Sequence, residues 1–459
     1  MKSRKIIINL MPYCKMLPKP HRYTCFYFLS LVFVLLQGCT MNKRIGKAAE
    51  DIILKDSAAR SGFTGISIYE PASGKYWYNY NATKYFTPAS NTKLFTLYAG
   101  MKYTGDSLCT AKIREDRDAL YIFPNADPGF LNPEFSYQPL LELLKQTNKN
   151  IIIIDTAWKE KALGYGWAWD DYNDDYMAER SAMPVFGNTV YAKGTPQNAF
   201  ILPRFFKDSL TWDSSNARGN YIGSIKRDLV QNTFYAAVGA KKEAAFVVPY
   251  ITLNGYTNYQ VLENELGKKV FQSKEYRPVM GGLAERRIYS QPKDSLFRVM
   301  MHRSDNFFAE QTLLMASNER LGLMNDESII DTLLANDLRD IPQKPKWVDG
   351  SGLSRYNLFT PQSFIYILNK LSNEFGLERL KNILPTGGQG TLRSYFKNDQ
   401  GYIFAKTGTL SNNCALSGFL LTNKGKLLIF SILANHYQTG ATPIRKATER
   451  FLEEIRKKY

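Results

Sequence analysis

Histidine and cysteine are scarce in this chain of 459 residues, which has three of the former and five of the latter. Only His302 and His436 lie beyond the first 39 residues, and no CxxC or HExxH pattern occurs. A histidine-rich zinc site is therefore not expected, and a Ser-His-Asp triad would have only two candidate bases. No motif in the sequence implies a metal or organic cofactor. Cys109 and Cys414 could form one disulfide or serve as small buried apolar residues.

Acidic residues are outnumbered, 42 against 59 lysines and arginines, which gives a net charge of +17. Six of these positive charges lie in residues 1–39, which leaves a moderately basic protein of +11. There is no dense Arg/Lys run and no nucleic-acid motif, so we expect an anionic membrane or cell-wall partner and no nucleic acid. A hydrophobic content of 44% and this length exclude disorder and collagen, and favour two or three domains.

The apolar run at residues 26–36 is too short for a comfortable membrane span but suits the core of a secretory signal. Basic residues precede it, and it ends in Leu36-Gln37-Gly38-Cys39, which resembles a bacterial lipobox. Residues 1–39 are therefore predicted to be a lipoprotein signal peptide, with Cys39 lipidated and the exported protein anchored to a membrane in the periplasm. An ordinary cleaved signal and an uncleaved anchor are the alternatives.

Turn chemistry and periodicity outline the folded part. Residues 65–70 and 75–79 flank the turn at 71–74 and predict a β-hairpin, after a short helix at 48–59. A helix is predicted next, with Thr87 as its cap and Pro88 at its first position. Near the end, residues 417–422 and 427–435 predict a second hairpin, and 442–458 a terminal helix.

Residues 106–284 lack this regularity and contain only short strand-like runs. We interpret them as one or two mainly β subdomains inserted into an α/β catalytic domain. That domain is discontinuous and comprises residues 61–105 and 285–459. No repeat of fixed period is present, which excludes solenoids and propellers.

Acyl transfer without histidine needs a nucleophile and a base one helical turn apart, and Ser-x-x-Lys provides both. The pattern occurs at Ser90/Lys93, at Ser290/Lys293 and at Ser394/Lys397. Context favours Ser90, because the first turn of a helix has unpaired N–H groups and the positive end of the helix dipole. In the second tetrad, Pro292 lies between the two functional groups, and the third lies in a polar stretch near a loop.

Two further segments can complete such a site. Ser304-Asp305-Asn306 supplies a hydroxyl and an amide for proton relay, and Lys406-Thr407-Gly408-Thr409 follows a strand-like run. A glycine after Lys-Thr lets a ligand approach an edge strand closely. Lys406 near Lys93 would lower the pKa of Lys93 and keep its amine available as a base.

These three motifs, in this order, resemble the signature of penicillin-binding proteins and class A β-lactamases. Ser304 follows Ser90 by 214 residues, and Lys406 follows Ser304 by 102. The large insert resembles the D-alanyl-D-alanine carboxypeptidase/endopeptidase family, the low-molecular-mass class C penicillin-binding proteins of peptidase family S13. The amino-acid sequences of several flanking segments are also similar to those of that family: residues 86–93, 166–171, 349–355 and 390–392.

The resemblance implies a penicillin-binding-protein/β-lactamase-like fold, with an antiparallel sheet flanked by helices. It implies that Ser90 is acylated, that Lys93 is its base, and that Ser304 and Asn306 form the second catalytic element. Ser304 and Lys406 would complete the proton relay and dock the terminal carboxylate of the substrate. The segment Thr407, Gly408 and Thr409 would bind substrate, and the N–H groups of Ser90 and Thr409 would form the oxyanion hole. The implied substrates are D-Ala-D-Ala stem peptides of peptidoglycan, with β-lactams as covalent inhibitors.

Two other functions remain open at this point. A β-lactamase would need a base that activates water for deacylation, and nothing in the sequence marks one. A non-catalytic peptidoglycan-binding lipoprotein could retain the fold and use its aromatic, basic surface. Asp305 is expected to be a turn residue, His302 to pack or face solvent, and Trp167 and Trp169 to be buried aromatics of the insert more often than ligand-stacking residues.

Overall fold

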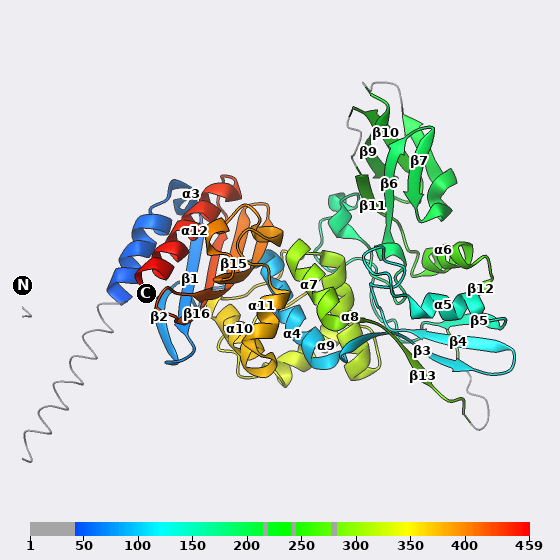
Figure 1. Ribbon diagram of the computed structural model, residues 1–459, viewed down its shortest axis with the longest axis horizontal. Helices are drawn as coiled ribbons and strands as arrows, with labels where there is room; N and C mark the ends of the chain where they lie inside the picture. The colour runs from blue at the N-terminus through cyan, green and yellow to red at the C-terminus, as the bar shows by residue number, and fades with distance from the viewer. Residues whose placement is uncertain (1–41, 214–218, 241–244, 277–281) are drawn as a thin grey trace, which may run out of the picture.

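The structure is a computed structural model that describes residues 42–213, 219–240, 245–276 and 282–459. Two lobes are visible in Figure 1: the two ends of the described chain meet in one lobe, and the middle of the chain forms the other. The predicted signal peptide, with Cys39, lies outside the described residues. Within those ranges, no helix has both the length and the apolar character needed to cross a bilayer.

The first lobe is built on a five-stranded antiparallel sheet in the order β14-β15-β16-β1-β2. Both predicted hairpins are confirmed, and β1 pairs with β16 so that Ile66 lies opposite Ile432. Distant ends of the catalytic segments therefore share one sheet, with β14 at its edge. The strands are β1 (Phe63–Glu70), β2 (Lys75–Tyr80), β14 (Ile403–Leu410), β15 (Asn413–Leu421) and β16 (Leu427–Asn435).

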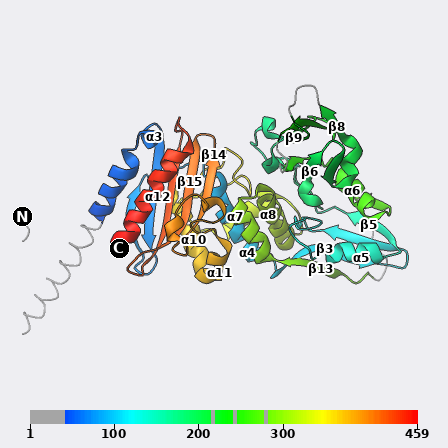
Figure 2. The same cartoon turned by 45° about the horizontal axis from the view of Figure 1, so that its top comes forward.

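Helices cover both faces of this sheet, which explains why successive residues of β16 are apolar. Phe430 packs with Phe451 of α12 (Ala441–Lys458), and Leu433 on the other face packs with residues of α10 (Pro361–Phe375). Figure 2 shows α12 lying over the sheet. The helical segment at residues 42–60 packs on the α12 side.

A helical layer joins the sheet to the second lobe. Its members are α4 (Lys93–Tyr103), α7 (Lys293–Arg303), α8 (Asn306–Leu321), α9 (Asp326–Ala335) and α11 (Leu377–Ile383). Helix α4 packs against α8 and is buried from Lys93 to Met101. A charged group at the start of α4 is therefore removed from water, which bears on its pKa.

The second lobe is the mainly β insert, in agreement with the prediction. Its larger sheet has the order β12-β5-β4-β3-β13, and two three-stranded sheets, β8-β10-β9 and β11-β6-β7, lie beside it. Strand β13 (Arg286–Pro292) pairs with β3, so this strand belongs to the sheet of the insert although our interpretation began the returning catalytic segment at residue 285. The remaining strands are β3 (Ser107–Glu115), β4 (Ala119–Pro124), β5 (Asn150–Ile154), β6 (Thr189–Thr195), β7 (Asn198–Leu202), β8 (Leu210–Asp213), β9 (Tyr221–Arg227), β10 (Phe234–Gly239), β11 (Ala245–Pro249) and β12 (Val270–Ser273).

Two more helices of the insert, and several short helical turns, complete the description. They are α5 (Pro139–Gln146), α6 (Tyr256–Leu266), α3 (Ser57–Arg60), η1 (Glu50–Leu54), η2 (Ala89–Thr92), η3 (Trp169–Asp171), η4 (Asp175–Met177), η5 (Phe186–Asn188), η6 (Arg204–Ser209), η7 (Gly390–Leu392) and η8 (Lys397–Asp399). The predicted helix at 48–59 is interrupted: residues 42–49 are α-helical, and η1 and α3 follow. Cys109 and Cys414 are both buried free thiols, so they form no disulfide with each other.

The predicted cap of the helix after the first hairpin is wrong. Thr87 uses its backbone N–H to donate to Asn435 Oδ1 at 2.7 Å, and Ala89 adopts a left-handed φ of 48°. The chain then forms the 3-10 turn η2, and α4 begins only at Lys93. Tertiary contact with β16 therefore displaces the helix start by several residues.

Candidate active site

Ser90 lies in the turn η2, directly after the left-handed Ala89. Left-handed backbone at a non-glycine residue costs free energy and persists only where the surroundings enforce it. Here Gly352 packs so closely that a Cβ on it would lie 2.0 Å from the carbonyl oxygen of Ala89. The loop around Gly352 thus holds the turn that presents Ser90.

Lys93 lies one turn further on, and its side chain is fully buried. Its Nζ donates to three oxygens: Ser90 Oγ at 2.9 Å, Asn306 Oδ1 at 2.6 Å and the carbonyl of Ser351 at 2.8 Å. Burial lowers the pKa of Lys93 to about 8, although the carboxylates of Asp305, Asp349 and Glu310 favour its charged form. At pH 7 about a tenth of such a lysine is neutral and can accept the proton of the serine.

Ser304 and Asn306 lie between α7 and α8. Ser304 caps α7 in the left-handed conformation, with a φ of 61°, and Asn306 is the first residue of α8. Asp305 caps α8 through a hydrogen bond to the N–H of Phe308 at 2.9 Å, which confirms its predicted structural role. The cap directs the serine toward β14 and the asparagine toward Lys93.

Lys406 lies on the edge strand β14 and is also fully buried. Its Nζ donates to Ser304 Oγ at 2.8 Å and to the carbonyl of Thr407 at 2.7 Å. Burial first, and the neighbouring Lys93 second, hold its pKa well below the usual range. The lysine therefore fixes the hydroxyl of Ser304, which lines the same cavity as Ser90.

Gly408 lets the edge strand β14 approach the turn η2 that carries Ser90. A Cβ on this residue would lie 2.6 Å from the carbonyl of Pro88 and 3.1 Å from the nitrogen of Ser90. A larger residue would separate the two segments. The structure thus brings together Ser90 of η2, Lys93 of α4, Ser304 at the end of α7, Asn306 at the start of α8 and Lys406 of β14.

A cavity of about 380 Å³ opens in front of the serine. Thr407 and Thr409 project into it from β14, and two arginines lie on its walls. Its lining residues are Ser90, Ser304, Thr391, Arg393, Ser394, Tyr395, Thr407, Thr409 and Arg445.

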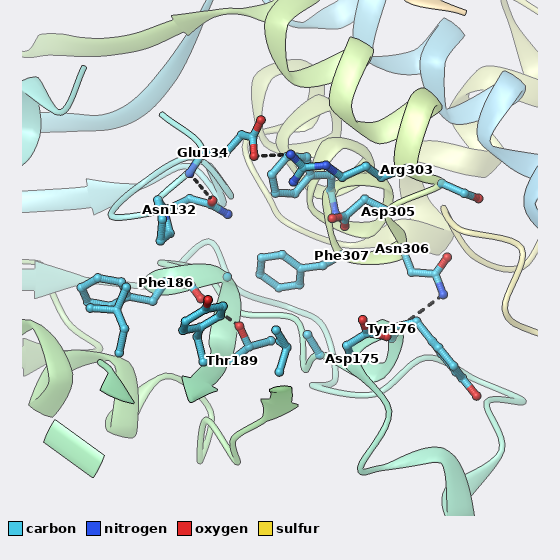
Figure 3. A pocket seen from close by; sticks show the side chains of 18 of the residues that line it. Asn132, Glu134, Asp175, Tyr176, Phe186, Thr189, Arg303, Asp305, Asn306 and Phe307 are labelled. Atoms are coloured by element: carbon cyan, nitrogen blue, oxygen red, sulfur yellow. Dashed lines mark hydrogen bonds and ion pairs between the residues drawn. The ribbon is translucent and has the colours of Figure 1, made fainter. Parts of the chain in front are cut away.

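A larger cavity of about 690 Å³ meets the first at Ser304 and separates the α7–α8 loop from the insert. Figure 3 shows Asn306 and Tyr176 on one side of it, joined by a hydrogen bond from Asn306 Nδ2 to the carbonyl of Tyr176 at 3.2 Å. On another side Arg303 pairs with Glu134 at 2.5 Å. The insert therefore forms part of the wall of the site, a role that the sequence did not define.

Sequence reasoning missed the buried groups that hold Ser351, whose carbonyl accepts from Lys93. The N–H of Ser351 donates to Glu310 Oε1 at 2.7 Å, and Glu310 Oε2 lies 3.5 Å from Arg180 Nη1. Arg180 is buried and also pairs with Asp326 at 2.6 Å and with Glu160 at 3.1 Å. The glycines on both sides of Ser351 were a signal of close packing, but nothing in the sequence connected them with Arg180.

The other two tetrads are arranged differently. Ser290 donates to Asp127 Oδ2 at 2.6 Å, whereas Lys293 donates to the carbonyls of Met101 and Thr104. Ser394 lines the smaller cavity, but the described hydrogen bonds do not join it to Lys397.

The histidine and the two tryptophans considered in the sequence line neither cavity. His302 is half-buried in the last turn of α7. The prediction that Trp169 is buried is wrong, because this side chain is 72% exposed. Trp167 donates to Asp349 Oδ2 at 3.0 Å. Among the residues that the structure describes, no group of three or more His, Cys, Asp and Glu is arranged to hold a metal ion.

Three motifs around one cleft, on an antiparallel sheet flanked by helices, define the penicillin-binding-protein and β-lactamase-like class of folds. Residues 47–203 and 282–455 match the D-Ala-D-Ala carboxypeptidase 3 (S13) family, and the chain belongs to this family. The resemblance inferred from the motifs is confirmed. Members of this family of serine D-Ala-D-Ala carboxypeptidases bind D-Ala-D-Ala peptides and β-lactams.

Individual relatives are distant in sequence. The chain is 25% identical over 413 residues to D-alanyl-D-alanine carboxypeptidase DacB of Haemophilus influenzae, covering 79% of this chain and 83% of the relative. The crystal structure of penicillin binding protein 4 (dacB) from the same organism is similar, with a TM-score of 0.69 at 18% identity over 90% of this chain and 99% of that one. A second structure of it, complexed with a novel β-lactam, gives a TM-score of 0.65 over the same shares at 18% identity.

Proposed function

We propose that this protein is a serine-type D-alanyl-D-alanine carboxypeptidase and DD-endopeptidase that acts on peptidoglycan stem peptides through an acyl-enzyme at Ser90. The observation that carries the proposal is the contact of 2.9 Å between Ser90 Oγ and Lys93 Nζ, with a lysine pKa of about 8. A buried amine of this kind can remove the hydroxyl proton without a histidine. Membership of the S13 family supports the choice of substrate.

Acylation begins when Lys93 accepts the proton of Ser90. The serine Oγ forms a bond to the carbonyl carbon of the penultimate D-alanine, and the carbonyl oxygen takes up the electron pair. Backbone N–H groups of Ser90 and Thr409 stabilise this oxyanion, because the edge strand is packed against the nucleophile turn. The C–N bond then breaks, and the carbonyl re-forms as the serine ester.

The leaving amine needs a proton. Ser304 Oγ accepts a hydrogen bond from Lys406 Nζ at 2.8 Å, so its own hydrogen is free to point into the cleft. Ser304 donates this proton to the amine and is reprotonated through Lys406 with the proton that Lys93 took from Ser90, so Lys93 is neutral again. D-alanine leaves, and water then attacks the ester with Lys93 again as the base, which regenerates Ser90.

The same bond occurs at D-alanyl cross-links between stem peptides, so the same groups can act as an endopeptidase. A β-lactam presents its strained amide to Ser90 in place of the peptide, which makes it a covalent inhibitor. The similarity to a penicillin binding protein 4 complexed with a novel β-lactam supports this part of the proposal.

The test is mass spectrometry after incubation with a labelled penicillin, together with an assay for D-alanine release from a D-Ala-D-Ala peptide. We expect one adduct on Ser90, and loss of both signals in Ser90→Ala. Ser394→Ala is the matched control, because this serine lines the same cavity and has a lysine three residues on. An adduct on Ser394, or D-alanine release by Ser90→Ala, would overturn the proposal.

Two alternative functions would be identified by two further assays. Sustained turnover of a chromogenic cephalosporin, with no long-lived adduct, would identify a β-lactamase. Equal binding of peptidoglycan by wild type and Ser90→Ala, with no D-alanine release from either, would identify a non-catalytic wall-binding lipoprotein.

We also propose that the protein is exported and is held to a membrane, facing the periplasm, by a lipid on Cys39. The lipobox-like Leu36-Gln37-Gly38-Cys39 after an apolar run supports this location. Expression with a labelled fatty acid should mark the wild type, and Cys39→Ala should be unlabelled and leave the membrane fraction. Labelling of Cys39→Ala would contradict the anchor.

A further inference from the structure

Trp167 belongs to the insert, to none of the three motifs, and to the lining of neither cavity. It lies in the segment between β5 and η3, and its side chain is half-buried. Its indole Nε1–H donates to Asp349 Oδ2 at 3.0 Å, across 182 residues of sequence. This contact joins the insert to a loop of the catalytic domain, residues 349–354.

Asp349 is the centre of that loop, and its side chain is fully buried. Its Oδ1 accepts from the backbone N–H of Gly352 at 2.8 Å and from Asn357 Nδ2 at 2.7 Å. Its Oδ2 accepts from the backbone N–H of Ser354 at 2.6 Å and from the indole of Trp167. All four donors are uncharged, and a buried carboxylate loses stabilisation with each one that is removed. Trp167 is the donor through which the insert holds the loop.

The loop at 349–354 contacts both groups that are proposed to react first. The carbonyl of Ser351 accepts from Lys93 Nζ at 2.8 Å. Gly352 packs against the left-handed Ala89, directly before Ser90. A shift of this loop would therefore change the positions of the base and the nucleophile together. Such geometry affects rates steeply, since a displacement of about 1 Å can cost about 100-fold.

The segment that carries Trp167 is itself held firmly. The buried guanidinium of Arg180 lies 5.6 Å from the centre of the Trp167 ring and donates to the carbonyl of Lys161 at 3.1 Å. Nearby, the ring of Tyr165 stacks on that of Tyr356, with centroids 5.0 Å apart. The indole is therefore a fixed support for the loop that it contacts.

We propose that Trp167 is a positioning residue for the acylation of Ser90, and that it acts through Asp349 and the loop at 349–354. The inference rests on the proposed function, because it assigns part of the geometry of that reaction to the insert. Ligand binding depends on the walls of the cavities, to which Trp167 does not contribute. Loss of its N–H should therefore slow bond formation without weakening the initial complex.

The experiment measures acylation by a chromogenic β-lactam in stopped flow, as a function of ligand concentration. This gives the dissociation constant of the initial complex and the first-order rate constant of acylation separately. Trp167→Phe keeps an aromatic ring and removes the indole N–H. We expect the rate constant to fall by about 10-fold, the effect of losing a hydrogen bond to a charged group, and the dissociation constant to stay the same.

Two further variants complete the comparison. Trp167→His places a ring N–H close to the position of the indole N–H and should recover part of the rate constant. Trp158→Phe is the matched control, because this half-buried tryptophan packs against the helical layer and should leave both constants unchanged.

The two constants distinguish the outcomes, and neither depends on how much of a sample is folded. A weaker initial complex with an unchanged rate constant would show that Trp167 contacts the ligand. A lower melting temperature with both constants unchanged would show a purely structural role. Either result overturns the inference, as does a Trp167→Phe variant that is identical to wild type. If the wild-type serine is not acylated at all, the proposed function itself fails, which is a different result.

Discussion

Lys93 and Asn306 are 213 residues apart in the chain, yet Nζ of the lysine donates to Oδ1 of the asparagine at 2.6 Å. This contact is shorter than the contact of the same amine with Ser90 Oγ, at 2.9 Å. The amide is a neutral acceptor, so it orients the amine without the strong stabilisation of the ammonium form that a carboxylate would give. Helix α8 therefore aims the base, while burial in α4 sets its pKa.

The rate of acylation should depend on pH through Lys93. The base must be neutral to accept the serine proton, so the second-order rate constant should rise with pH through a midpoint near 8 and level off above it. Stopped-flow measurement with a chromogenic β-lactam between pH 5 and pH 10 checks this. A rate that is independent of pH across this range would contradict the assignment of Lys93 as the base.

Asn306→Asp should move this pH profile. A carboxylate next to the amine stabilises its ammonium form and should raise the pKa of Lys93 by about 1 to 3 units, so acylation at pH 7 should slow by a similar power of ten. Asn132→Asp is the control, because Asn132 lines the larger cavity without contacting Lys93. Identical pH profiles for wild type and Asn306→Asp would show that residue 306 does not influence the pKa of Lys93.

Gly408→Ala should damage both the site and the fold. The new methyl group would meet the carbonyl of Pro88 and the nitrogen of Ser90, both on rigid backbone. We expect a loss of about 1 to 3 kcal/mol in the free energy of unfolding and a fall in acylation rate, because β14 must move away from the turn. Gly440→Ala is the control, since a Cβ at that position meets nothing within 4 Å. Chemical denaturation and the acylation assay measure the two effects, and a fully active Gly408→Ala would be inconsistent with this account.

Arg180→Met should destabilise the protein strongly. It would leave the carboxylates of Glu160, Glu310 and Asp326 buried together without a cation, a change that typically costs about 3 to 5 kcal/mol. Burial and the neighbouring Asp349 already raise the pKa of Glu310 above its usual range, so Glu310→Gln should cost less than Arg180→Met. Arg339→Ala is the exposed control. Thermal unfolding measures the stability of each variant. A Glu310→Gln variant less stable than Arg180→Met would contradict the prediction.

Local signals in the sequence predicted much of the fold. Each hairpin has its own turn residues and alternating strands, so 71–74 and the loop before Leu427 could be recognised without knowledge of the rest. The start of α4 could not, because Thr87 is held by Asn435, a contact that only the folded chain provides. Strand β13 was assigned to the catalytic segment because its pairing with β3 is likewise non-local.

The motif residues were predictable because each carries a distinctive chemical group at a fixed spacing. Ser351 acts through its backbone carbonyl, which every residue has, and so its contact with Lys93 left no sequence signal. Arg445 is one basic residue among several on α12, and only the fold shows that it reaches Thr409. The sequence therefore predicted the residues whose side-chain type defines their role. It did not predict the residues that matter only because the fold places them near the site.

The turn that carries Ser90 is packed between Gly352 and Gly408, and both glycines lie in the last quarter of the chain. A nascent polypeptide emerges from the ribosome amino end first, so this serine appears long before the segments that enforce its geometry. Until those segments arrive, its hydroxyl has only the reactivity of an ordinary alcohol. The proposed acylation of Ser90 therefore requires that both of these later segments have folded against its turn.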